Sequence, residues 1–485
     1  MFTSTLHARK RRPVLLANLC VVAFAGILCP SAAGAPAKSD IAAAIDKMLG
    51  APALEGGVTG VLVERASDGE VVYERAADTR LMPASNRKLF SSANGLVILG
   101  KDFTFQTQVL SRAPADSEGV IAGDVTLKGG GDSTIMPDDL TKMADDLWAR
   151  GVRRIDGNIV GDGTAFPGQP YGMGWGWDYL SDDYAAQIWG LEVNRGVITV
   201  HVSAGGGDGE PVKVSLDPGV DKIPIVNNAR TGGTAPACVI TRDWNTSVIT
   251  VSGALPKGEK TQTDIAVGDP ITYAAEVFRT ALIHRGIEVK GAAYAAAVAV
   301  GDKTVLATRR SVPLDQYLKL MNKPSDNLLA ESIVREIGQV KAGQGTYEAG
   351  YAEERRLLES EGIDIHLLQL ADGSGVSRRD YVTAHAVVGL LRVMARRPDF
   401  SVYYDSLPVA GVDGTLRKRM KGTSAQGNVH AKTGTVGEVS CLSGYLTSKD
   451  KILYTFSILM NNFPGSASEA QGVQNQIVTY LTDRL

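Results

Sequence analysis

The most informative stretch of this sequence is Pro83-Ala84-Ser85-Asn86-Arg87-Lys88, in which a lysine follows a serine by three residues. A helical pattern begins at Ser85 and ends before Gly100. Residues i and i+3 lie on one face of a helix, so we expect the Lys88 amine next to the Ser85 hydroxyl. A serine hydroxyl is a poor nucleophile without an adjacent base, and a lysine whose pKa is lowered can be that base.

The serine–lysine spacing is a weak signal by itself, because Ser448-Lys449-Asp450-Lys451 repeats it in a charged turn. A helix cap with a solvated lysine is the simpler interpretation of either copy. A second motif, Ser325-Asp326-Asn327, follows a proline and precedes an apolar helical pattern. A loop at a helix start can direct Ser325 and Asn327 into a cleft, although an ordinary N-cap has the same sequence.

A third motif, Lys432-Thr433-Gly434-Thr435, lies in the strand-like run 429–435. In a strand, Lys432 and Gly434 share one face, and Thr433 and Thr435 share the other. A glycine lets a ligand approach the backbone, and the lysine can supply charge for a carboxylate. Taken alone, this motif also describes an ordinary strand with an exposed lysine.

Together the motifs appear in the order S-x-x-K, S-D-N and K-T-G, at a helix start, a loop and a strand. This trio is typical of β-lactamases and penicillin-binding proteins. The chain resembles the class C low-molecular-mass penicillin-binding proteins, the peptidase S13 family of D-alanyl-D-alanine carboxypeptidases and endopeptidases. The large separation of Ser85 from Ser325 matches the insertion of that family. Three stretches resemble its other signatures: Ala371–Arg378 (ADGSGVSR), Leu407–Leu416 (LPVAGVDGTL) and Trp175–Asp178 (WGWD). Gln187 departs from the pattern, because a proline is expected there.

The resemblance implies an α+β fold, a β-lactamase/transpeptidase-like domain in which helices flank an antiparallel sheet. We expect residues 36–100 and 305–485 to form this split catalytic domain, with a hairpin at 60–75 joining three C-terminal strands (429–435, 439–446 and 452–460). Strand-like runs at 120–128, 155–160 and 197–202 alternate with glycine-rich loops. They predict a β-rich insertion over residues 101–304, with two subdomains.

The resemblance also implies a mechanism. Ser85 would attack the carbonyl between two D-alanines, and Lys88 would take its proton, kept neutral by repulsion from Lys432. Ser325 would pass a proton to the leaving amine, and Asn327 would hold Lys88 and the substrate. Lys432 and Thr433 would bind the terminal carboxylate, while backbone N–H groups of Ser85 and Thr435 would form the oxyanion hole beside Gly434. No metal or organic cofactor is expected, and the histidines form no zinc pattern.

The family places a pocket for the free end of a diaminopimelate side chain beside the cleft. That end carries a carboxylate and an amine, so a base and an acid should face it. Arg378 is the candidate for the carboxylate. Asp162 is the candidate for the amine, with Phe166 lining the wall. A loop arginine and a surface aspartate are the alternative interpretation.

The N-terminus reads as a signal peptide over residues 1–35. A cationic start at 7–12 precedes an apolar run of about 15 residues and the small residues Ser31–Ala35. Cleavage after Ala33 or after Ala35, a twin-arginine route and a retained anchor all stay open. The full chain has a net charge of −3, and removing four basic residues and no acid lowers it to −7. An acidic mature protein argues against a nucleic-acid partner.

We therefore predict a secreted, periplasmic or extracytoplasmic serine hydrolase that acts on peptidoglycan stem peptides and is inhibited covalently by β-lactams. The alternatives are a β-lactamase or esterase with the same trio, and a catalytically silent wall-binding protein. The sequence leaves open the balance of carboxypeptidase and endopeptidase activity, and any peripheral association with a membrane. It also leaves open a disulfide between Cys238 and Cys441, although we expect them in different domains.

Overall fold

The computed structural model describes residues 38–220, 222–299, 301 and 303–485. The predicted signal peptide lies outside these residues. Within them, no helix is both long and apolar enough to cross a membrane. Both cysteines of this part are free thiols, Cys441 buried and Cys238 half-buried.

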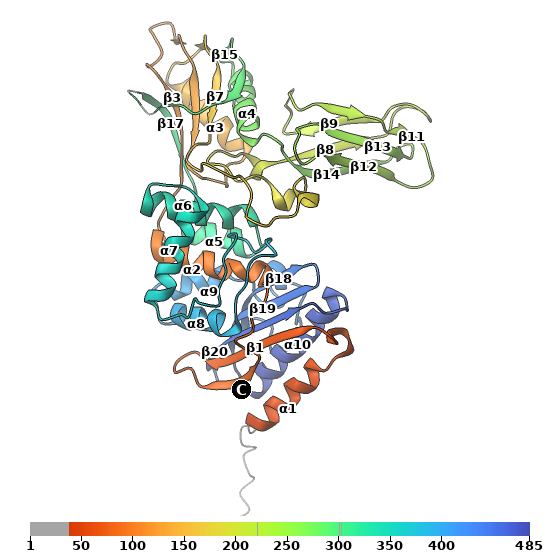
Figure 1. Ribbon diagram of the computed structural model, residues 1–485. Coiled ribbons are helices and arrows are strands. Elements are labelled where there is room, and N and C mark those ends of the chain that lie inside the picture. Colours follow the sequence, from red (N-terminus) through yellow and green to blue (C-terminus); the bar gives the residue numbers. More distant parts are fainter. Residues whose placement is uncertain (1–37, 221, 300, 302) are drawn as a thin grey trace, which may run out of the picture. The chain divides into compact units, whose positions relative to one another are not determined.

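A five-stranded antiparallel sheet joins the two ends of the described chain (Figure 1). Its order is β18 (Val429–Val436), β19 (Val439–Thr447), β20 (Leu453–Asn461), β1 (Val58–Arg65) and β2 (Val71–Arg75). The predicted hairpin and the predicted C-terminal strands are confirmed, because β1 pairs with β20 along its whole length, from Val58 opposite Asn461 to Arg65 opposite Tyr454. The predicted α+β class is likewise confirmed.

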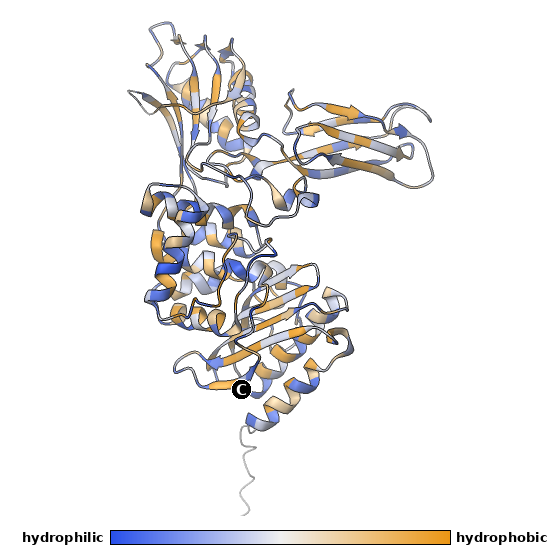
Figure 2. Ribbon diagram, viewed as in Figure 1, coloured by the Kyte–Doolittle hydropathy of each residue, from blue (hydrophilic) through white to orange (hydrophobic). Residues whose placement is uncertain are grey.

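Both faces of this sheet are buried under helices, and its strands carry long hydrophobic runs (Figure 2). Successive strand residues point to opposite faces. Val61 and Val63 pack in one core with α1 (Lys38–Leu49) and α10 (Ala467–Arg484). Leu62, between them, packs in the other core with α2 (Arg87–Leu99) and α8 (Ala384–Ala395). Each fully buried aliphatic side chain stabilises this arrangement by about 1.5–3 kcal/mol.

The remaining helices of the second core are α5 (Leu314–Asn322), α6 (Asn327–Ala342), α7 (Tyr347–Ser360) and α9 (Phe400–Ser406). They carry one of the three motifs, Ser325-Asp326-Asn327, at the start of α6. Asp326 is the N-cap of α6, and its carboxylate accepts a hydrogen bond from the Leu329 N–H at 3.0 Å. The polar motif therefore caps a helix and also faces the site described below.

Residues between α2 and α5 form further sheets. One has the order β16-β7-β5-β3-β17 and includes parallel pairs. Beside it lies a short parallel sheet with the order β15-β6-β4. The strands are β3 (Gln106–Ser111), β4 (Val120–Ile121), β5 (Val125–Gly129), β6 (Arg154–Ile155), β7 (Ile159–Asp162), β15 (Glu288–Val289), β16 (Ala293–Ala295) and β17 (Thr304–Arg310).

Two sequence expectations for this region are wrong. The runs 120–128 and 155–160 are each broken into two strands, and Gly157 occupies the second break, where a Cβ would collide with the backbone of Gly123 and Asp124. Two helices that we did not expect, α3 (Pro137–Ala149) and α4 (Pro270–Arg285), also lie here. Parallel strands need crossover connections, and α3 supplies the one between β5 and β7.

Two smaller sheets complete the region. The first is β14-β8-β9, formed by β8 (Val197–Ser203), β9 (Lys213–Asp217) and β14 (Lys260–Ala266). The second is β10-β13-β11 with β12 paired to β13, formed by β10 (Ile225–Asn227), β11 (Arg230–Thr231), β12 (Ala237–Arg242) and β13 (Ile249–Leu255). Val200 of β8 and Val251 of β13 are fully buried in a common core, so the two sheets pack on each other.

Candidate active site

Ser85 lies in the 3₁₀ turn Ala84–Asn86, immediately before α2. The α-helix therefore starts two residues later than the sequence predicts, because Ala84 has a positive φ of 44° that bends the chain at this point. The three-residue spacing still brings Lys88 to Ser85. Ser85 is half-buried, whereas Lys88 has no exposed surface. A hydroxyl open to ligand thus stands against an amine sealed from water.

The Lys88 amine makes three hydrogen-bond contacts. Nζ lies 3.0 Å from Ser85 Oγ, 2.7 Å from Asn327 Oδ1 and 2.8 Å from the Ser374 carbonyl oxygen. The Asn327 side chain is oriented by its other end, where Nδ2 donates to the Tyr184 carbonyl at 2.8 Å. A neutral amine has two N–H donors and one lone pair. The two acceptors that cannot donate take the N–H groups, so the lone pair is directed at the Ser85 hydroxyl.

The second lysine, Lys432, is also fully buried. Its Nζ donates to Ser325 Oγ at 2.9 Å and to the Thr433 carbonyl at 3.0 Å. Ser325 has a positive φ of 68°, which turns its side chain away from the path of α6. The three motifs thus meet as two serine–lysine pairs, Ser85 with Lys88 and Ser325 with Lys432.

Burial is the main cause of a lowered pKa at both lysines. It lowers the pKa of Lys88 to about 8, against the opposing charges of Asp372 and Glu331. It lowers the pKa of Lys432 further, and there the positive charge of Lys88 adds to the effect. The positive charge of Lys88 thus disfavours a proton on Lys432, as expected for two like charges, and the contribution of Lys432 to keeping Lys88 neutral stays a prediction.

Two glycines let backbone segments close around Ser85. A Cβ on Gly434 would lie 2.6 Å from the Pro83 carbonyl oxygen and 2.9 Å from the Ser85 nitrogen. Strand β18 therefore passes directly over the Ser85 N–H only because residue 434 has no side chain. Gly375, with a φ of 86°, is likewise pressed against the Ala84 carbonyl. The Asn86 amide ties the turn to β18 by donating to the Lys432 carbonyl at 2.9 Å.

The threonines of the third motif face outward. Thr433 is half-buried and Thr435 is exposed. Thr433 Oγ1 lies 2.8 Å from Thr415 Oγ1, so the 407–416 stretch meets the third motif. Lys323 holds that stretch by donating to the Leu407 carbonyl and to the Asp413 carboxylate. The signature quoted from sequence therefore extends the polar rim of the site.

Sequence analysis missed a buried carboxylate, Glu331 of α6. Its two oxygens accept the N–H groups of Gly373 and Ser374 at 2.7 and 2.8 Å. These contacts fix the loop whose Ser374 carbonyl binds Lys88. Burial and the charge of Asp372 raise the pKa of Glu331 to about 7. The only signal in the sequence is an acid four residues after Asn327 in an apolar helix, which is not distinctive.

Asp372 holds the same loop together from inside. Its carboxylate accepts the N–H groups of Gly375 and Ser377, and also the indole N–H of Trp175 at 2.9 Å. Burial opposes its ionisation, but hydrogen bonds from Asp380 and from these N–H groups hold the pKa of Asp372 below its usual value. Two stretches quoted separately from sequence, 175–178 and 371–378, thus meet at one carboxylate.

Of the three residues predicted for a side-chain pocket, only Arg378 is accessible. Its side chain is 51% exposed and lies against Gly437, in the turn after Thr435. Asp162 is fully buried, and its oxygens already accept from Thr164 and Val298 and pair with Lys128 at 3.5 Å.

Phe166 is fully buried against Ile188 and Leu328. Neither Asp162 nor Phe166 therefore offers an open surface to a substrate. Burial is the main cause of a raised pKa at Tyr179; the negative charge of Asp178 adds to the rise, and the positive charge of Arg378 opposes it.

A cavity of about 510 Å³ opens beside Ser325 and Asn327. The charged residues that line this cavity are Asp183, Arg195, Asp264 and Asp326. Arg195 is paired with Asp326 at 2.7 Å. Among the described residues, no group of three or more His, Cys, Asp or Glu side chains is arranged to hold a metal ion.

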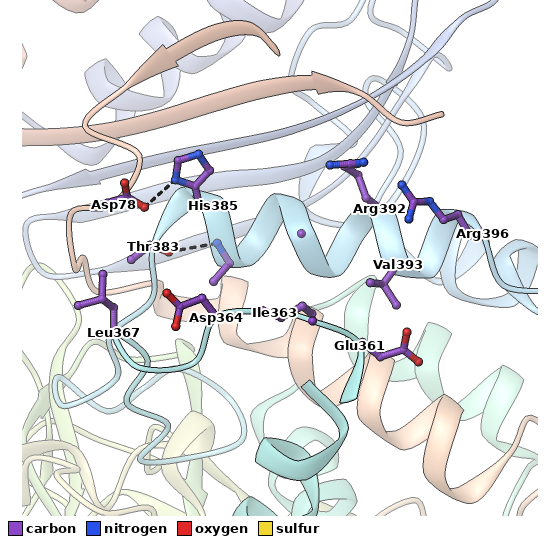
Figure 3. Close-up of a pocket in the computed structure, with 13 residues that line it drawn as sticks. Asp78, Glu361, Ile363, Asp364, Leu367, Thr383, His385, Arg392, Val393 and Arg396 are labelled. Atoms are coloured by element: carbon purple, nitrogen blue, oxygen red, sulfur yellow. Dashed lines mark hydrogen bonds and ion pairs between the residues drawn. The ribbon is translucent and has the colours of Figure 1, made fainter. Parts of the chain in front are cut away.

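A second cavity, of about 230 Å³, lies along α8 and contains no residue of the three motifs (Figure 3). Its charged groups are largely paired within the protein: Asp78 with His385 at 2.7 Å and Arg392 with Glu64 at 3.0 Å. It is therefore not part of the site.

Comparison with known proteins agrees with this geometry. The profile of the D-Ala-D-Ala carboxypeptidase 3 (S13) family matches residues 41–484. The chain belongs to this family. Within it, the D-alanyl-D-alanine carboxypeptidase of Actinomadura sp. (strain R39) is 38% identical over 455 residues, which cover 90% of this chain and 84% of the relative. The predicted relationship is confirmed, and with it the assignment as a serine-type peptidase of the D-Ala-D-Ala carboxypeptidase class.

Solved structures agree with the S13 fold. The crystal structure of penicillin binding protein 4 (dacB) from Haemophilus influenzae has a TM-score of 0.80 at 24% identity, covering 90% of this chain and 99% of that one. The same protein in complex with a novel β-lactam has a TM-score of 0.74 at 24% identity, covering 90% and 98%. The arrangement of the five-stranded sheet, its helices and the added sheets is therefore the fold of the H. influenzae structure.

Proposed function

We propose that the chain hydrolyses the bond after a D-alanine in peptidoglycan stem peptides, through an ester on Ser85, and that β-lactams acylate the same serine. The observation that carries this proposal is the Lys88 amine, 3.0 Å from Ser85 Oγ with its two N–H directions occupied. Membership of the S13 family supports the substrate class. The β-lactam bound to the H. influenzae relative supports the inhibitor class.

In acylation, Ser85 Oγ attacks the D-alanine carbonyl while its proton moves to the Lys88 lone pair. The carbonyl oxygen becomes an oxyanion, which we assign to the N–H groups of Ser85 and Thr435, held in register by Gly434. Collapse breaks the C–N bond as the leaving amine takes a proton from Ser325, and the proton held by Lys88 then passes to Ser325, which leaves both groups in their starting states. In deacylation, water attacks the ester and gives a proton to Lys88, and Lys88 protonates Ser85 Oγ as the C–O bond breaks.

Substrate binding increases the repulsion that acts on Lys88. We assign the terminal carboxylate to Lys432, Thr433 and the neighbouring Thr415. An anion beside Lys432 favours its protonated form. The positive charge on the protonated Lys432 then disfavours protonation of Lys88. Lys88 therefore stays neutral and becomes the base. Binding and deprotonation are thereby coupled, so that a substrate with a carboxylate prepares its own nucleophile.

For the side-chain pocket we retain Arg378 and replace Asp162 and Phe166 by Asp178 and Tyr179. Arg378 is accessible beside Gly437, and its charge acts on Tyr179. Asp178 is exposed, and its negative charge changes the pKa of the same tyrosine in the opposite direction. Hydrogen bonds of Trp175 to Asp372 and of Ser377 to the Met173 carbonyl join the two stretches that carry Asp178 and Arg378. A base and an acid suit a side chain that ends in a carboxylate and an amine.

We further propose that residues 1–35 are a signal peptide and that the protein acts outside the cytoplasmic membrane. We also propose the division into a split catalytic domain, 36–100 with 305–485, and an insertion, 101–304. The position of peptidoglycan outside that membrane supports the export, and the separate sheets of the insertion support the division.

The decisive experiment is intact-mass analysis after incubation with benzylpenicillin, on the wild type and on Ser85→Ala. A stable one-to-one adduct on the wild type alone would establish an acylable Ser85. If no adduct forms and the penicillin is not consumed, a silent wall-binding protein becomes the better assignment. If no adduct forms and the penicillin is consumed rapidly, the protein is a β-lactamase.

A further inference from the structure

The three-stranded sheet β14-β8-β9 has one apolar and one polar face. Along β8, Ile198, Val200 and Val202 are buried in the core of the region. Thr199, His201 and Ser203 alternate with these residues along the strand. They therefore point to the opposite face, and they are half-buried. A sheet of three strands therefore presents an outer face built from polar side chains.

Strand register places the outward residues in three rows, with charge changing along the face. The rows are Asp264–Thr199–Asp217, Gln262–His201–Ser215 and Lys260–Ser203–Lys213. Successive rows are two residues apart, roughly 7 Å at the rise of a strand. The face therefore runs from an acidic row through a neutral row to a basic row over about 14 Å.

The acidic row begins at the catalytic groups. Thr199 and Asp264 line the same 510 Å³ cavity as Ser325 and Asn327, and Thr199 donates to Asp264 at 2.6 Å. The other two rows line a second hollow of about 400 Å³ on the sheet. Both hollows lie on one polar face, so a ligand that leaves the catalytic cavity along β8 meets the neutral row and then the two lysines.

The leaving group is the part of the substrate that passes this way. Under the proposed function, Ser325 hands a proton to the departing amine, and Ser325 forms a wall of the cavity. A single departing D-alanine is small and needs no binding surface beyond the cavity. A departing peptide strand needs such a surface, because it has a newly released amine at the broken bond and free carboxylates farther along. An acidic row near the bond and a basic row farther out match this order of charge.

We propose that the outer face of β14-β8-β9 binds the acceptor peptide when a cross-linked pair of stem peptides is cleaved. This inference rests on the proposed function. An extended peptide of four residues spans about 13–14 Å, the length of the three rows. Asp264 takes the released amine, and Lys213 with Lys260 takes the carboxylates.

The test reverses the charges of the two lysines in the basic row, which lie away from the reacting bond. Lys213→Glu/Lys260→Glu is compared with wild type on a purified cross-linked dimer of stem peptides, on a linear peptide ending in D-Ala-D-Ala and on benzylpenicillin. We expect kcat/KM on the dimer to fall about tenfold through KM, with kcat unchanged, because remote contacts bind ground and transition states alike. Linear cleavage and penicillin acylation stay at the wild-type rates.

The matched control is Lys47→Glu/Lys142→Glu, which changes the net charge equally at exposed lysines of α1 and α3 that line neither hollow. It should leave all three activities unchanged. Equal rates of dimer cleavage in the test variant and the wild type would overturn the inference, and so would equal loss on dimer and linear peptide. Loss of binding to glycan strands stripped of peptides, with normal dimer cleavage, would assign the face to glycan instead. Absence of penicillin acylation in the wild type would contradict the proposed function and not this face.

Discussion

The amine of Lys88 lies 3.0 Å from the hydroxyl of Ser85, and this hydroxyl has no other hydrogen-bond partner among the described residues. The other two contacts of the amine, Asn327 Oδ1 and the Ser374 carbonyl, are acceptors without a proton to exchange. The geometry therefore supports the proposal that Lys88 is the base that activates Ser85, whereas Lys432 contacts Ser325.

Replacing the base should abolish acylation without unfolding the protein. Lys88→Met keeps the aliphatic stem in its buried position and removes the amine. We expect the rate of benzylpenicillin acylation to fall by about 10²–10⁴, the usual contribution of a general base. The control is Lys451→Met, which changes the second copy of the serine–lysine spacing, in an exposed turn. A rate in Lys88→Met within tenfold of wild type would mean that another group takes the proton.

The rate of acylation should rise with pH through about 8. Below the pKa of Lys88, about 8, the amine is protonated and cannot accept the Ser85 proton. Above it the amine is neutral, so kcat/KM for benzylpenicillin increases from pH 6 to pH 9 and then levels off. Stopped-flow acylation across this range measures the profile, with circular dichroism to establish that the fold is intact at each pH. A flat profile, or one that falls over this interval, is incompatible with Lys88 as the base.

Much of this site could be predicted from sequence because its motifs are local. The spacing of Ser85 and Lys88 within one helical turn, and the alternation along 432–435, are set by backbone periodicity. The hairpin and the C-terminal strands could be predicted for the same reason.

Groups brought in from distant segments could not be predicted. Glu331 and the Ser374 carbonyl act on Lys88 only through tertiary packing. The helices α3 and α4 were missed because short strands and glycine-rich loops dominate the pattern around them. Asp162 was misjudged because a Gly-Asp-Gly-Thr match does not reveal that the aspartate accepts hydrogen bonds from its own loop.

The close passage of β18 over Ser85 should not tolerate a methyl group. Gly434→Ala places a Cβ 2.9 Å from the Ser85 nitrogen, so the strand must move away from the N–H group that we assign to the oxyanion. We expect acylation to slow by about 10²–10³, the cost of losing one oxyanion donor. Gly472→Ala is the control, because a Cβ there, in α10, meets nothing within 4 Å. A Gly434→Ala variant with the wild-type acylation rate would show that β18 does not form this wall.

Removing one partner of the buried ion pair between Arg87 and Glu354 should strongly destabilise the helical layer. The two side chains are 2.6 Å apart and have no exposed surface, and Arg87 also donates to the Asp372 carbonyl at 2.7 Å. Glu354→Ala leaves a buried guanidinium without its counter-charge, which costs about 3–5 kcal/mol of unfolding free energy. Chemical denaturation measures this loss.

The control is Glu353→Ala, one residue earlier on α7. It breaks a pair with the largely exposed Arg356 and should cost under about 1 kcal/mol. A double variant, Arg87→Met/Glu354→Leu, should regain much of the stability, because it removes both charges from the interior together. If the double variant is as unstable as Glu354→Ala, the loss comes from the cavity and the broken contact with the 372 loop, and not from the unpaired charge.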